Sequence, residues 1–259
     1  MPIADGVGSE ENGKAGEGMT AYGFPMIGAH TGCLNTPYNT VESFMEGIAS
    51  GADVAEVDVR AAKDGTAILF HDDSPLFREK TYEELNAPEI RARLGPIYET
   101  RDVVRLERIL DIAAMNRIRL NLDIKSEEAI EPTIRLVRRY ELVDRTYITG
   151  ESGDLTIRHP DIRVLWNAPS SARAERSRYS LYVEQVCRKA RTEGYHGLNL
   201  HYADCLPELV EQARAQQLKV WVYTVNERRD MENLVAMGVD QITTKAVDEL
   251  VRLKRERAL

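Results

Sequence analysis

The sequence lacks long apolar runs, a basic surplus and a secretory leader pattern. No run approaches the roughly 18 apolar residues that a membrane-spanning helix needs. The first 20 residues do not show a basic stretch followed by an apolar one, so we expect a cytoplasmic protein without a transmembrane segment. Acidic residues outnumber basic ones by 42 to 34, for a formal net charge of −8. This balance argues against nucleic acid or an anionic membrane as the main partner, because both attract a basic surface.

Cysteine is scarce as well. The three cysteines, Cys33, Cys187 and Cys205, lie far apart and form no CxxC pair. This spacing argues against a disulfide framework and against a cysteine-based zinc site, and we expect reduced thiols. Because Cys33 lies near a candidate site residue, His30, two interpretations stay open for it: a packed side chain or a reactive thiol.

What the sequence does contain is a regular alternation of β-branched runs and amphipathic stretches. It begins after residues 1–20, which hold five glycines, four acidic residues and one lysine and are expected to form a flexible tail. Such alternation is typical of a parallel sheet covered by helices. The predicted strands are Pro25–His30, Asp53–Val59, Thr66–His71, Arg119–Lys125, Thr146–Thr149, Ile162–Trp166, Gly197–His201, Lys219–Thr224 and Val239–Thr243. The predicted helices are Thr40–Ser50, Leu106–Asn116, Glu127–Tyr140, Arg178–Glu193, Cys205–Gln216, Glu227–Met237 and Val247–Arg257, with a further short turn at Asp154–Arg158.

These strands exceed by one the eight of a closed (β/α)8 barrel. The connection between the second and third predicted strands is too short for a parallel crossover, which takes a dozen or more residues. Its Asp64-Gly65 pair is typical of a tight turn, so the third strand is predicted to return as a hairpin arm, with His71 opposite Asp58. We therefore predict a single α/β domain over residues 21–259, a TIM barrel with this hairpin and an irregular insertion at about 72–104.

Carboxylates gather on two neighbouring strands of this barrel, near the carboxyl ends where functional groups of such barrels lie. Side chains alternate between the two faces of a strand, so Glu56 and Asp58 share a face with Arg60, and Asp123 shares one with Lys125. Three converging carboxylates repel one another unless a cation neutralises them, and oxygen ligands suit Mg²⁺ or Ca²⁺. We predict one such divalent cation at this cluster; the alternative is that these carboxylates only bind helix N-termini or exposed arginines.

Two histidines are predicted at the same rim. His30 ends the first strand, and His71 ends the hairpin arm. A single histidine at such a place is usually structural, whereas two beside a carboxylate cluster indicate an acid/base pair. His201, at the end of a later strand with Asn199 two residues before it, is a candidate for contacts that support the site.

Several motifs occur in a fixed order along the chain. IGAHTG at 27–32 is followed by PYNT at 37–40, AEVDV at 55–59, KDG at 63–65, FHDD at 70–73, NLDIK at 121–125 and VYTVN at 222–226. In this order the chain resembles the glycerophosphodiester phosphodiesterase family, whose pattern has HRG, PENT, ELDV, KDG, HD, N-x-E-x-K and VWTVN. The resemblance covers nearly all of the chain after residue 22 and implies a (β/α)8 barrel with an insertion after the HD segment.

The resemblance also implies a role for each matched residue. The catalytic histidines of the family match His30 and His71, its metal ligands match the three carboxylates, with Asp123 in place of a glutamate, and its phosphate-side lysine matches Lys125. It implies metal-dependent hydrolysis of glycerophosphodiesters to glycerol 3-phosphate and an alcohol. A glycerol hydroxyl attacks the neighbouring phosphorus, one histidine accepts its proton and the other protonates the departing alcohol. Water then opens the cyclic phosphate with the roles reversed.

Four further positions depart from the family pattern. Thr31 replaces the arginine of HRG and removes a bidentate phosphate ligand. Tyr38 replaces the glutamate of PENT, Lys245 replaces the aspartate of a terminal Thr-Asp, and Tyr223 replaces the tryptophan of VWTVN. For the lost arginine we predict Arg60 as the substitute, the alternative being an ordinary surface arginine. The predicted substrate-binding residues are Lys125, Arg60, Thr31, Tyr223 and Trp221. Trp221 lies two positions before Tyr223 and is expected on the same face of the strand.

Three functions stay open at this point. The retained acid, base, metal and lysine positions favour hydrolysis of glycerophosphodiesters. The same barrel is also compatible with cleavage of lysophospholipids or of another hydroxyl-bearing phosphodiester. The loss of arginine at Thr31 leaves a third alternative, a catalytically weakened barrel that binds phosphorylated ligands. The connection 167–179, with Arg173, Arg176 and Arg178, is either solvated or recruits an anionic headgroup or a second phosphate.

Overall fold

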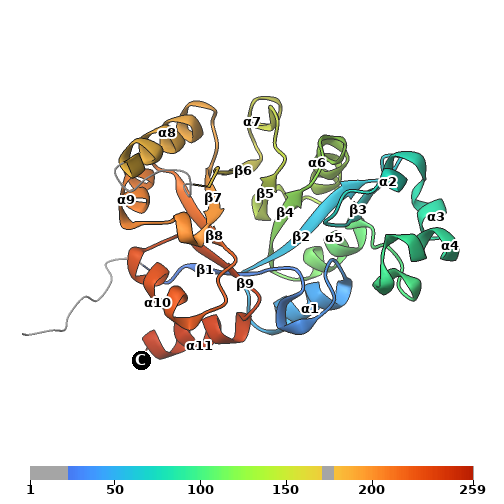
Figure 1. Cartoon of the computed structure of the whole chain (residues 1–259), viewed down its shortest axis with the longest axis horizontal. Coiled ribbons are helices and arrows are strands. Elements are labelled where there is room, and N and C mark those ends of the chain that lie inside the picture. The colour runs from blue at the N-terminus through green and yellow to red at the C-terminus, as the bar shows by residue number, and fades with distance from the viewer. Residues whose placement is uncertain (1–22, 171–177, 259) are drawn as a thin grey trace, which may run out of the picture.

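The computed structural model describes residues 23–170 and 178–258. Within them, strands and helices alternate, and the strands curve into one barrel-shaped sheet (Figure 1). The predicted tail at 1–20 and the loop residues Arg173 and Arg176 lie outside the described residues. The strands are β1 Met26–Ala29, β2 Val54–Ala61, β3 Ala67–Leu69, β4 Arg119–Ile124, β5 Thr146–Gly150, β6 Arg163–Asn167, β7 Gly197–His201, β8 Lys219–Tyr223 and β9 Gln241–Thr244.

The barrel closes because β1 pairs in parallel with both β2 and β9. Among the described residues the sheet has nine strands in the order β1-β9-β8-β7-β6-β5-β4-β2-β3. The extra strand, β3, is the one that runs antiparallel, against β2, and the other eight form the predicted (β/α)8 barrel. Because β2 pairs with β4 so that Asp58 lies next to Asp123, the two strands bring their carboxylates to the same level.

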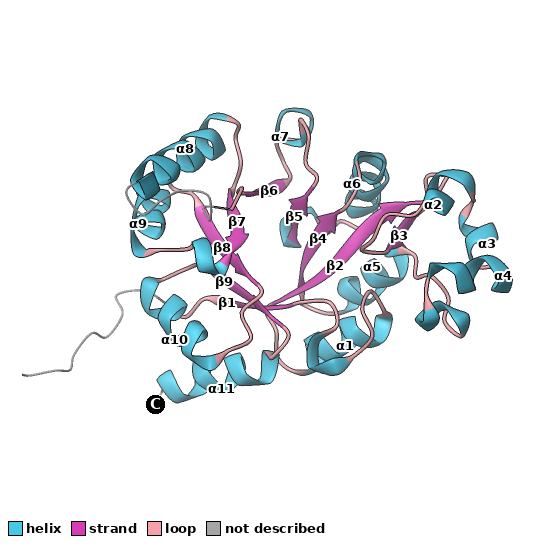
Figure 2. Cartoon of the chain, viewed as in Figure 1, coloured by secondary structure: helices cyan, strands magenta, loops and turns pink. Residues whose placement is uncertain are grey.

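The longer helices cover the outside of the sheet (Figure 2). In α5, the buried residues Leu106, Ile109, Leu110 and Ala113 recur at helical spacing and form the inward face. The helices are α1 Val41–Ala49, α2 Pro75–Glu79, α3 Tyr82–Leu85, α4 Pro88–Arg91, α5 Leu106–Met115, α6 Ile130–Arg139, α7 Leu155–Arg158, α8 Tyr179–Thr192, α9 Pro207–Ala215, α10 Arg228–Met237 and α11 Val247–Arg257. Over the described residues, none of them combines the length and the apolarity that crossing a membrane takes.

The β2–β3 hairpin forms as predicted, but its register differs by one residue. The amide N–H of Phe70 donates to the carbonyl of Asp58 at 3.2 Å, so Phe70 and not His71 lies opposite Asp58. The cause is the turn. The N–H of Ala62 donates to the carbonyl of Thr66 at 2.9 Å, which leaves three residues in the loop rather than two. The third loop residue is Gly65, which has a φ of 76°. Three-residue hairpin loops of this kind require a residue in the left-handed conformation at that position.

The insertion is more regular than the sequence suggests. It contains α2, α3 and α4 and two short 3₁₀ segments, η2 Ala92–Leu94 and η3 Pro96–Glu99. The hydroxyl of Ser74 caps α2, and Thr81 with Glu84 forms a capping box on α3. Elements of four or five residues are too short to show a 3.6-residue hydrophobic period, so the local signals were these caps and the prolines that begin α2, α4 and η3. The insertion has a small core of its own, which includes Phe70, Phe77, Leu85, Tyr98 and Val103.

A separate apolar layer lies inside the barrel, near the amino-terminal ends of its strands. It contains Val54, Tyr147, Leu165 and Trp221, with Met26 packed against it. The ring of Trp221 is fully buried, and its centroid lies 4.6 Å from that of Tyr147. This layer fills the lower half of the barrel, so the open space lies at the carboxyl ends of the strands.

Candidate active site

A cavity of 280 Å³ opens at the carboxyl ends of the strands. Charged and imidazole side chains from the first part of the chain line one wall: His30, Glu56, Asp58, His71, Asp123 and Lys125. Amide, hydroxyl and phenol groups from β5 to β8 and the residue after it line the other: Thr149, Asn167, Asn199, Tyr223 and Thr224. Among the residues that the structure describes, the cavity lining is therefore ionic on one side and uncharged on the other.

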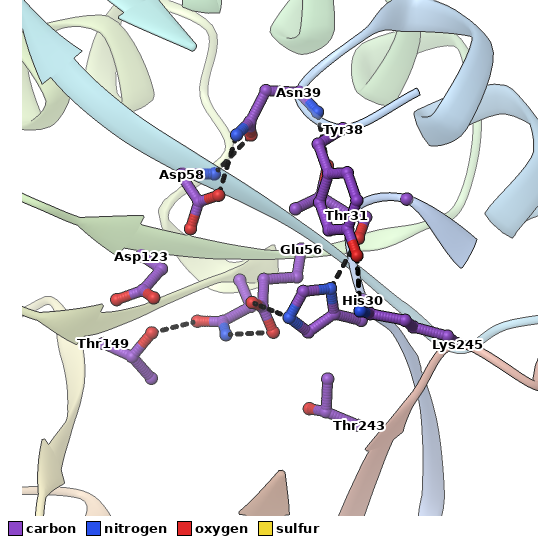
Figure 3. A network of polar contacts seen from close by, with 12 residues as sticks. His30, Thr31, Tyr38, Asn39, Glu56, Asp58, Asp123, Thr149, Thr243 and Lys245 are labelled. Atoms are coloured by element: carbon purple, nitrogen blue, oxygen red, sulfur yellow. Dashed lines mark hydrogen bonds and ion pairs between the residues drawn. The ribbon is translucent and has the colours of Figure 1, made fainter. Parts of the chain in front are cut away.

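The three predicted carboxylates converge on the ionic wall (Figure 3). Glu56, Asp58 and Asp123 each offer an oxygen, and these oxygens lie within 4.8 Å of one another. Burial and the neighbouring carboxylates of Asp123 and Asp58 hold the pKa of Glu56 well above its usual value. Burial also raises the pKa of Asp123, despite the opposing effect of Lys125. Burial is the largest cause of both shifts, and repulsion between the neighbouring carboxylates acts in the same direction.

Lys125 supplies the positive charge nearest to this cluster. Its Nζ lies 3.0 Å from Oδ1 of Asp58 and 2.5 Å from Oδ2 of Asp123. Burial alone would lower the pKa of Lys125, but the carboxylates of Asp123 and Asp58 outweigh that effect and raise it. One ammonium cannot balance three carboxylates, and Oδ1 of Asp123 is buried without a hydrogen-bond partner among the described residues. The donor set thus fits a hard divalent cation held by oxygen ligands.

Asn39 holds Asp58 in place, a role that the sequence analysis did not assign. Its Nδ2 donates to Oδ2 of Asp58 at 2.8 Å, and its Oδ1 accepts the amide N–H of Asp58 at 3.0 Å. Asn39 has a φ of 56°, a conformation that asparagine tolerates better than most residues. The signal that could have identified it is its place in the PYNT segment, directly before the Thr40 cap of α1.

Replacing Asn39 by aspartate is expected to destabilise the metal-free protein. Asn39→Asp keeps the size, the backbone preference and the acceptor, but it removes the donor and faces Asp58 with a second carboxylate. We expect the free energy of unfolding to fall by about 1–3 kcal/mol, measured by urea denaturation in chelator. Asn116→Asp, which loses an amide donor to the carbonyl of Ile112 away from the cavity, is the matched control. An unfolding midpoint for Asn39→Asp equal to that of the unmodified protein would contradict this role.

The two histidines reach the cavity with different surroundings. The Nδ1 of His30 contacts the carbonyl of Thr31, and its Nε2 lies 3.9 Å from Oε1 of Glu56. A carbonyl accepts only from a protonated nitrogen, so this contact leaves the lone pair on Nε2. Burial lowers the pKa of His30, against smaller opposing contributions from Thr31 and Asp58. His71 is more open: its side chain is 64% exposed, and its Nδ1 lies 2.8 Å from Oδ1 of Asp72.

The structure does not bring Thr31 or Trp221 into the cavity, contrary to the prediction that they bind substrate. Thr31 is buried, and its Oγ1 accepts the amide N–H of Asn39 at 2.6 Å, so it stabilises the loop that carries Asn39. Trp221 does share a face with Tyr223, but two residues along a strand correspond to roughly 6–7 Å. Trp221 therefore belongs to the layer below, while Tyr223 lines the cavity.

Arg60 also lies outside the cavity, where a phosphate ligand was expected. Because β2 extends to Ala61, residue 60 belongs to the hairpin and not to the barrel rim. Its Nε donates to the carbonyl of His71 at 3.0 Å, and its Nη1 lies 3.4 Å from Oδ1 of Asp73. Arg60 thus ties the backbone of His71 to β2.

We expect Arg60→Ala to lower kcat roughly tenfold, because a small displacement of a reacting group is costly, while the affinity for inorganic phosphate stays unchanged. Steady-state kinetics and calorimetry with that ligand separate the two effects. Arg78→Ala is the control, since Arg78 donates to both oxygens of Asp73 but not to His71. A loss of affinity for inorganic phosphate in Arg60→Ala would instead support the phosphate-ligand interpretation.

Two other predicted residues receive ordinary surroundings. Cys33 is fully buried, and burial raises the pKa of its thiol, so the packed interpretation holds over the reactive one. His201 is exposed and accepts the amide N–H of Ala203 at 3.3 Å. Its neighbour on the same strand, Asn199, does reach the site: it lines the cavity and donates to Asn167 at 2.8 Å.

The sequence of the chain is similar to those of known phosphodiesterases. The sequence model of the glycerophosphoryl diester phosphodiesterase family matches residues 30–249 of the chain. A protein of Caldanaerobacter subterraneus named glycerophosphodiester phosphodiesterase is 25% identical over 245 residues, covering 89% of this chain and 98% of its own. A protein of Mycobacterium tuberculosis named probable glycerophosphodiester phosphodiesterase 2 is 28% identical, covering 86% and 88%.

Solved structures show the same fold. A glycerophosphodiester phosphodiesterase of Parabacteroides distasonis superposes with a TM-score of 0.75 at 23% identity, covering 92% of this chain and 100% of the other. A phosphodiesterase of Oleispira antarctica, described in complex with the product sn-glycerol-3-phosphate, gives a TM-score of 0.71 at 19% identity, covering 90% and 97%.

Proposed function

The chain belongs to the glycerophosphoryl diester phosphodiesterase family, and on this premise we propose that it is a phosphoric diester hydrolase that converts glycerophosphodiesters to glycerol 3-phosphate and an alcohol. The observation that carries the proposal is the meeting of His30, His71, Lys125 and three carboxylates in one cavity. These positions match the family pattern, with Asp123 in place of a glutamate, and together they supply proton transfer and charge stabilisation at a phosphodiester.

Glu56, Asp58 and Asp123 would hold one divalent cation, Mg²⁺ or Ca²⁺ by their all-oxygen chemistry. When bound, such a cation supplies Lewis-acid polarisation of the phosphate and of a substrate hydroxyl. Lys125 stays beside Asp58 and Asp123 and stabilises negative charge that develops on the phosphate oxygens. Asn39 keeps Asp58 oriented through its two hydrogen bonds.

The proposed first step is an attack by the glycerol hydroxyl next to the phosphate. Its oxygen forms a new bond to phosphorus, the bond from phosphorus to the leaving alcohol breaks, and a cyclic phosphate results. We assign His30 as the base, because its Nε2 carries the free lone pair and burial lowers its pKa. His71, whose Nδ1 lies 2.8 Å from Oδ1 of Asp72, protonates the departing alcohol. Attack by a neighbouring hydroxyl is intramolecular, which removes much of the entropic cost.

The second step reverses these roles. The oxygen of water forms a bond to phosphorus, and the bond from phosphorus to the glycerol oxygen that attacked in the first step breaks. His71 accepts the proton of the water, and His30 returns a proton to the departing glycerol oxygen. The uncharged wall, with Thr149, Asn167 and Asn199, offers hydrogen-bond partners for the glycerol throughout.

Turnover tests this function directly. The protein, supplied in parallel with Mg²⁺, Ca²⁺ and Mn²⁺, is incubated with glycerophosphocholine and with lysophosphatidylcholine, and the products are followed by phosphorus NMR. Glycerol 3-phosphate, preceded by a cyclic glycerophosphate, is the expected product. A cyclic lysophosphatidate from the second substrate alone would favour the lysophospholipid alternative. Ligand and metal binding without turnover would favour the weakened barrel.

A further inference from the structure

A second cleft lies against the proposed catalytic cavity and has a different chemistry. Its volume is 540 Å³, within the ~300–1,000 Å³ typical of small-ligand sites. It shares His30 and His71 with the cavity and is otherwise walled mainly by apolar and aromatic groups: Tyr38, Phe70, Leu94, Pro96, Ile97 and Tyr98. We call this space the apolar cleft. A phosphate held between the two histidines would have the polar cavity on one side and the apolar cleft on the other.

Resting on the proposed function, we infer that the apolar cleft binds an apolar substituent of the leaving alcohol, so that the preferred substrates are glycerophosphodiesters of alkyl or aryl alcohols. The two halves of the substrate match the two spaces. Glycerol carries hydroxyls and suits the wall of carboxylates and amides, while the other substituent on phosphorus faces side chains that offer it few hydrogen bonds.

The walls of the apolar cleft are formed in advance. The rings of Phe70 and Tyr98 stack with centroids 4.9 Å apart and an interplanar angle of 24°, and Phe77 packs edge-on against Phe70 at 4.9 Å. Phe70 and Tyr98 are buried in the small core of the insertion, against which Leu94 and Ile97 pack. A chain that enters this space covers apolar surface without a need for the walls to reorganise, which favours binding.

Charge at the rim selects against a cationic alcohol such as choline. Tyr38 is 48% exposed, and the Nζ of Lys245 lies 4.9 Å from its ring centroid and contacts its hydroxyl (Figure 3). The ring that would attract a quaternary ammonium therefore already carries a cation. The acid in the lining, Asp72, is engaged by Nδ1 of His71. These contacts leave the apolar cleft to neutral groups.

A series of glycerophosphodiesters tests the inference. The leaving alcohols are ethanol, butanol, hexanol and octanol, followed by choline and its uncharged isostere 3,3-dimethylbutanol. Release of glycerol 3-phosphate gives kcat/KM for each. We expect kcat/KM to rise by about fourfold per methylene, the value of a buried CH₂, until the apolar cleft is filled, and the dimethylbutyl diester to exceed the choline diester at least tenfold.

Variants connect the preference to the apolar cleft. Ile97→Ser and Leu94→Ser are expected to flatten the dependence on chain length. Ile157→Ser, at a side chain that is 79% exposed on α7, is the matched control and retains it. Turnover that is equal along the series, or fastest with choline, would overturn this inference and leave the proposed function intact. Absence of hydrolysis of every diester would overturn the proposed function and the inference together.

Discussion

Exhaustive removal of divalent cations is expected to abolish hydrolysis of glycerophosphodiesters and to lower the midpoint of thermal unfolding. The reason is the cluster of Glu56, Asp58 and Asp123, whose oxygens lie within 4.8 Å of one another and are balanced only in part by Lys125. A ligand at 100 times its Kd stabilises the folded state by about 2.7 kcal/mol, which corresponds to roughly 5–10 °C for a chain of this size. Calorimetry with and without added Mg²⁺ or Ca²⁺, alongside the activity assay, measures both effects.

Variants of Asp123 test whether its carboxylate is a ligand of the divalent cation. Asp123→Glu preserves a carboxylate and adds the methylene that the family pattern has here, so it should retain more activity and more metal-dependent stabilisation than Asp123→Asn. Asp161→Asn serves as the control, since Asp161 pairs with Arg138 on the surface. The reverse order of the two Asp123 variants would argue against ligation, and full activity after chelation would remove the cation from the mechanism.

Replacing either histidine of the cavity is expected to lower the activity almost as much as removing the cation. His30→Ala and His71→Ala are each expected to lower kcat by roughly 10²–10⁴-fold, the usual contribution of a positioned acid or base. Their combined loss should be less than additive, because a reaction without one proton transfer gains little from the other. His159→Ala, at a histidine paired with Glu131 away from the cavity, is the control. Near-normal turnover in either site variant would assign that histidine to structure.

The choice of leaving group separates the two roles. A p-nitrophenolate departs without a proton, so the p-nitrophenyl ester of glycerophosphate should restore much of the first-step rate in His71→Ala and little in His30→Ala. Recovery in His30→Ala instead would exchange the assignments of acid and base.

Alternation along single strands was enough to predict the ionic wall. Glu56 and Asp58 lie two residues apart on β2, and Asp123 and Lys125 lie two apart at the end of β4, so each pair faces the same way. Parallel pairing then places Asp58 beside Asp123. The fold followed from the same local evidence, because each strand and each long helix carries its own hydrophobic period.

Predictions that depended on the position of a side chain along the barrel axis, or on the geometry of a turn, were less successful. The shared face of Trp221 and Tyr223 says nothing of which layer of the barrel each occupies, and Trp221 proved to lie in the lower one. Arg60 was misplaced because strand pairing carries β2 past the barrel into the hairpin. The role of Asn39 depends on a left-handed loop residue that meets a strand 19 positions later, a contact without any periodic signal.

The contrast between the two cavity walls has a consequence for divergence. The two histidines, the carboxylates and Lys125 all come from residues 30–125, whereas the cavity lining that the structure describes between residues 149 and 224 is uncharged. Under the proposed function, substitutions in the second half of the chain can therefore change which polyol the cavity binds without altering the proposed catalytic groups. A variant library confined to Thr149, Asn167, Asn199 and Tyr223 would test this for the polyol, and variants of the apolar cleft would test the inferred preference for the leaving alcohol separately. Recognition of the polyol and recognition of the alcohol would thus depend on separate segments of the chain.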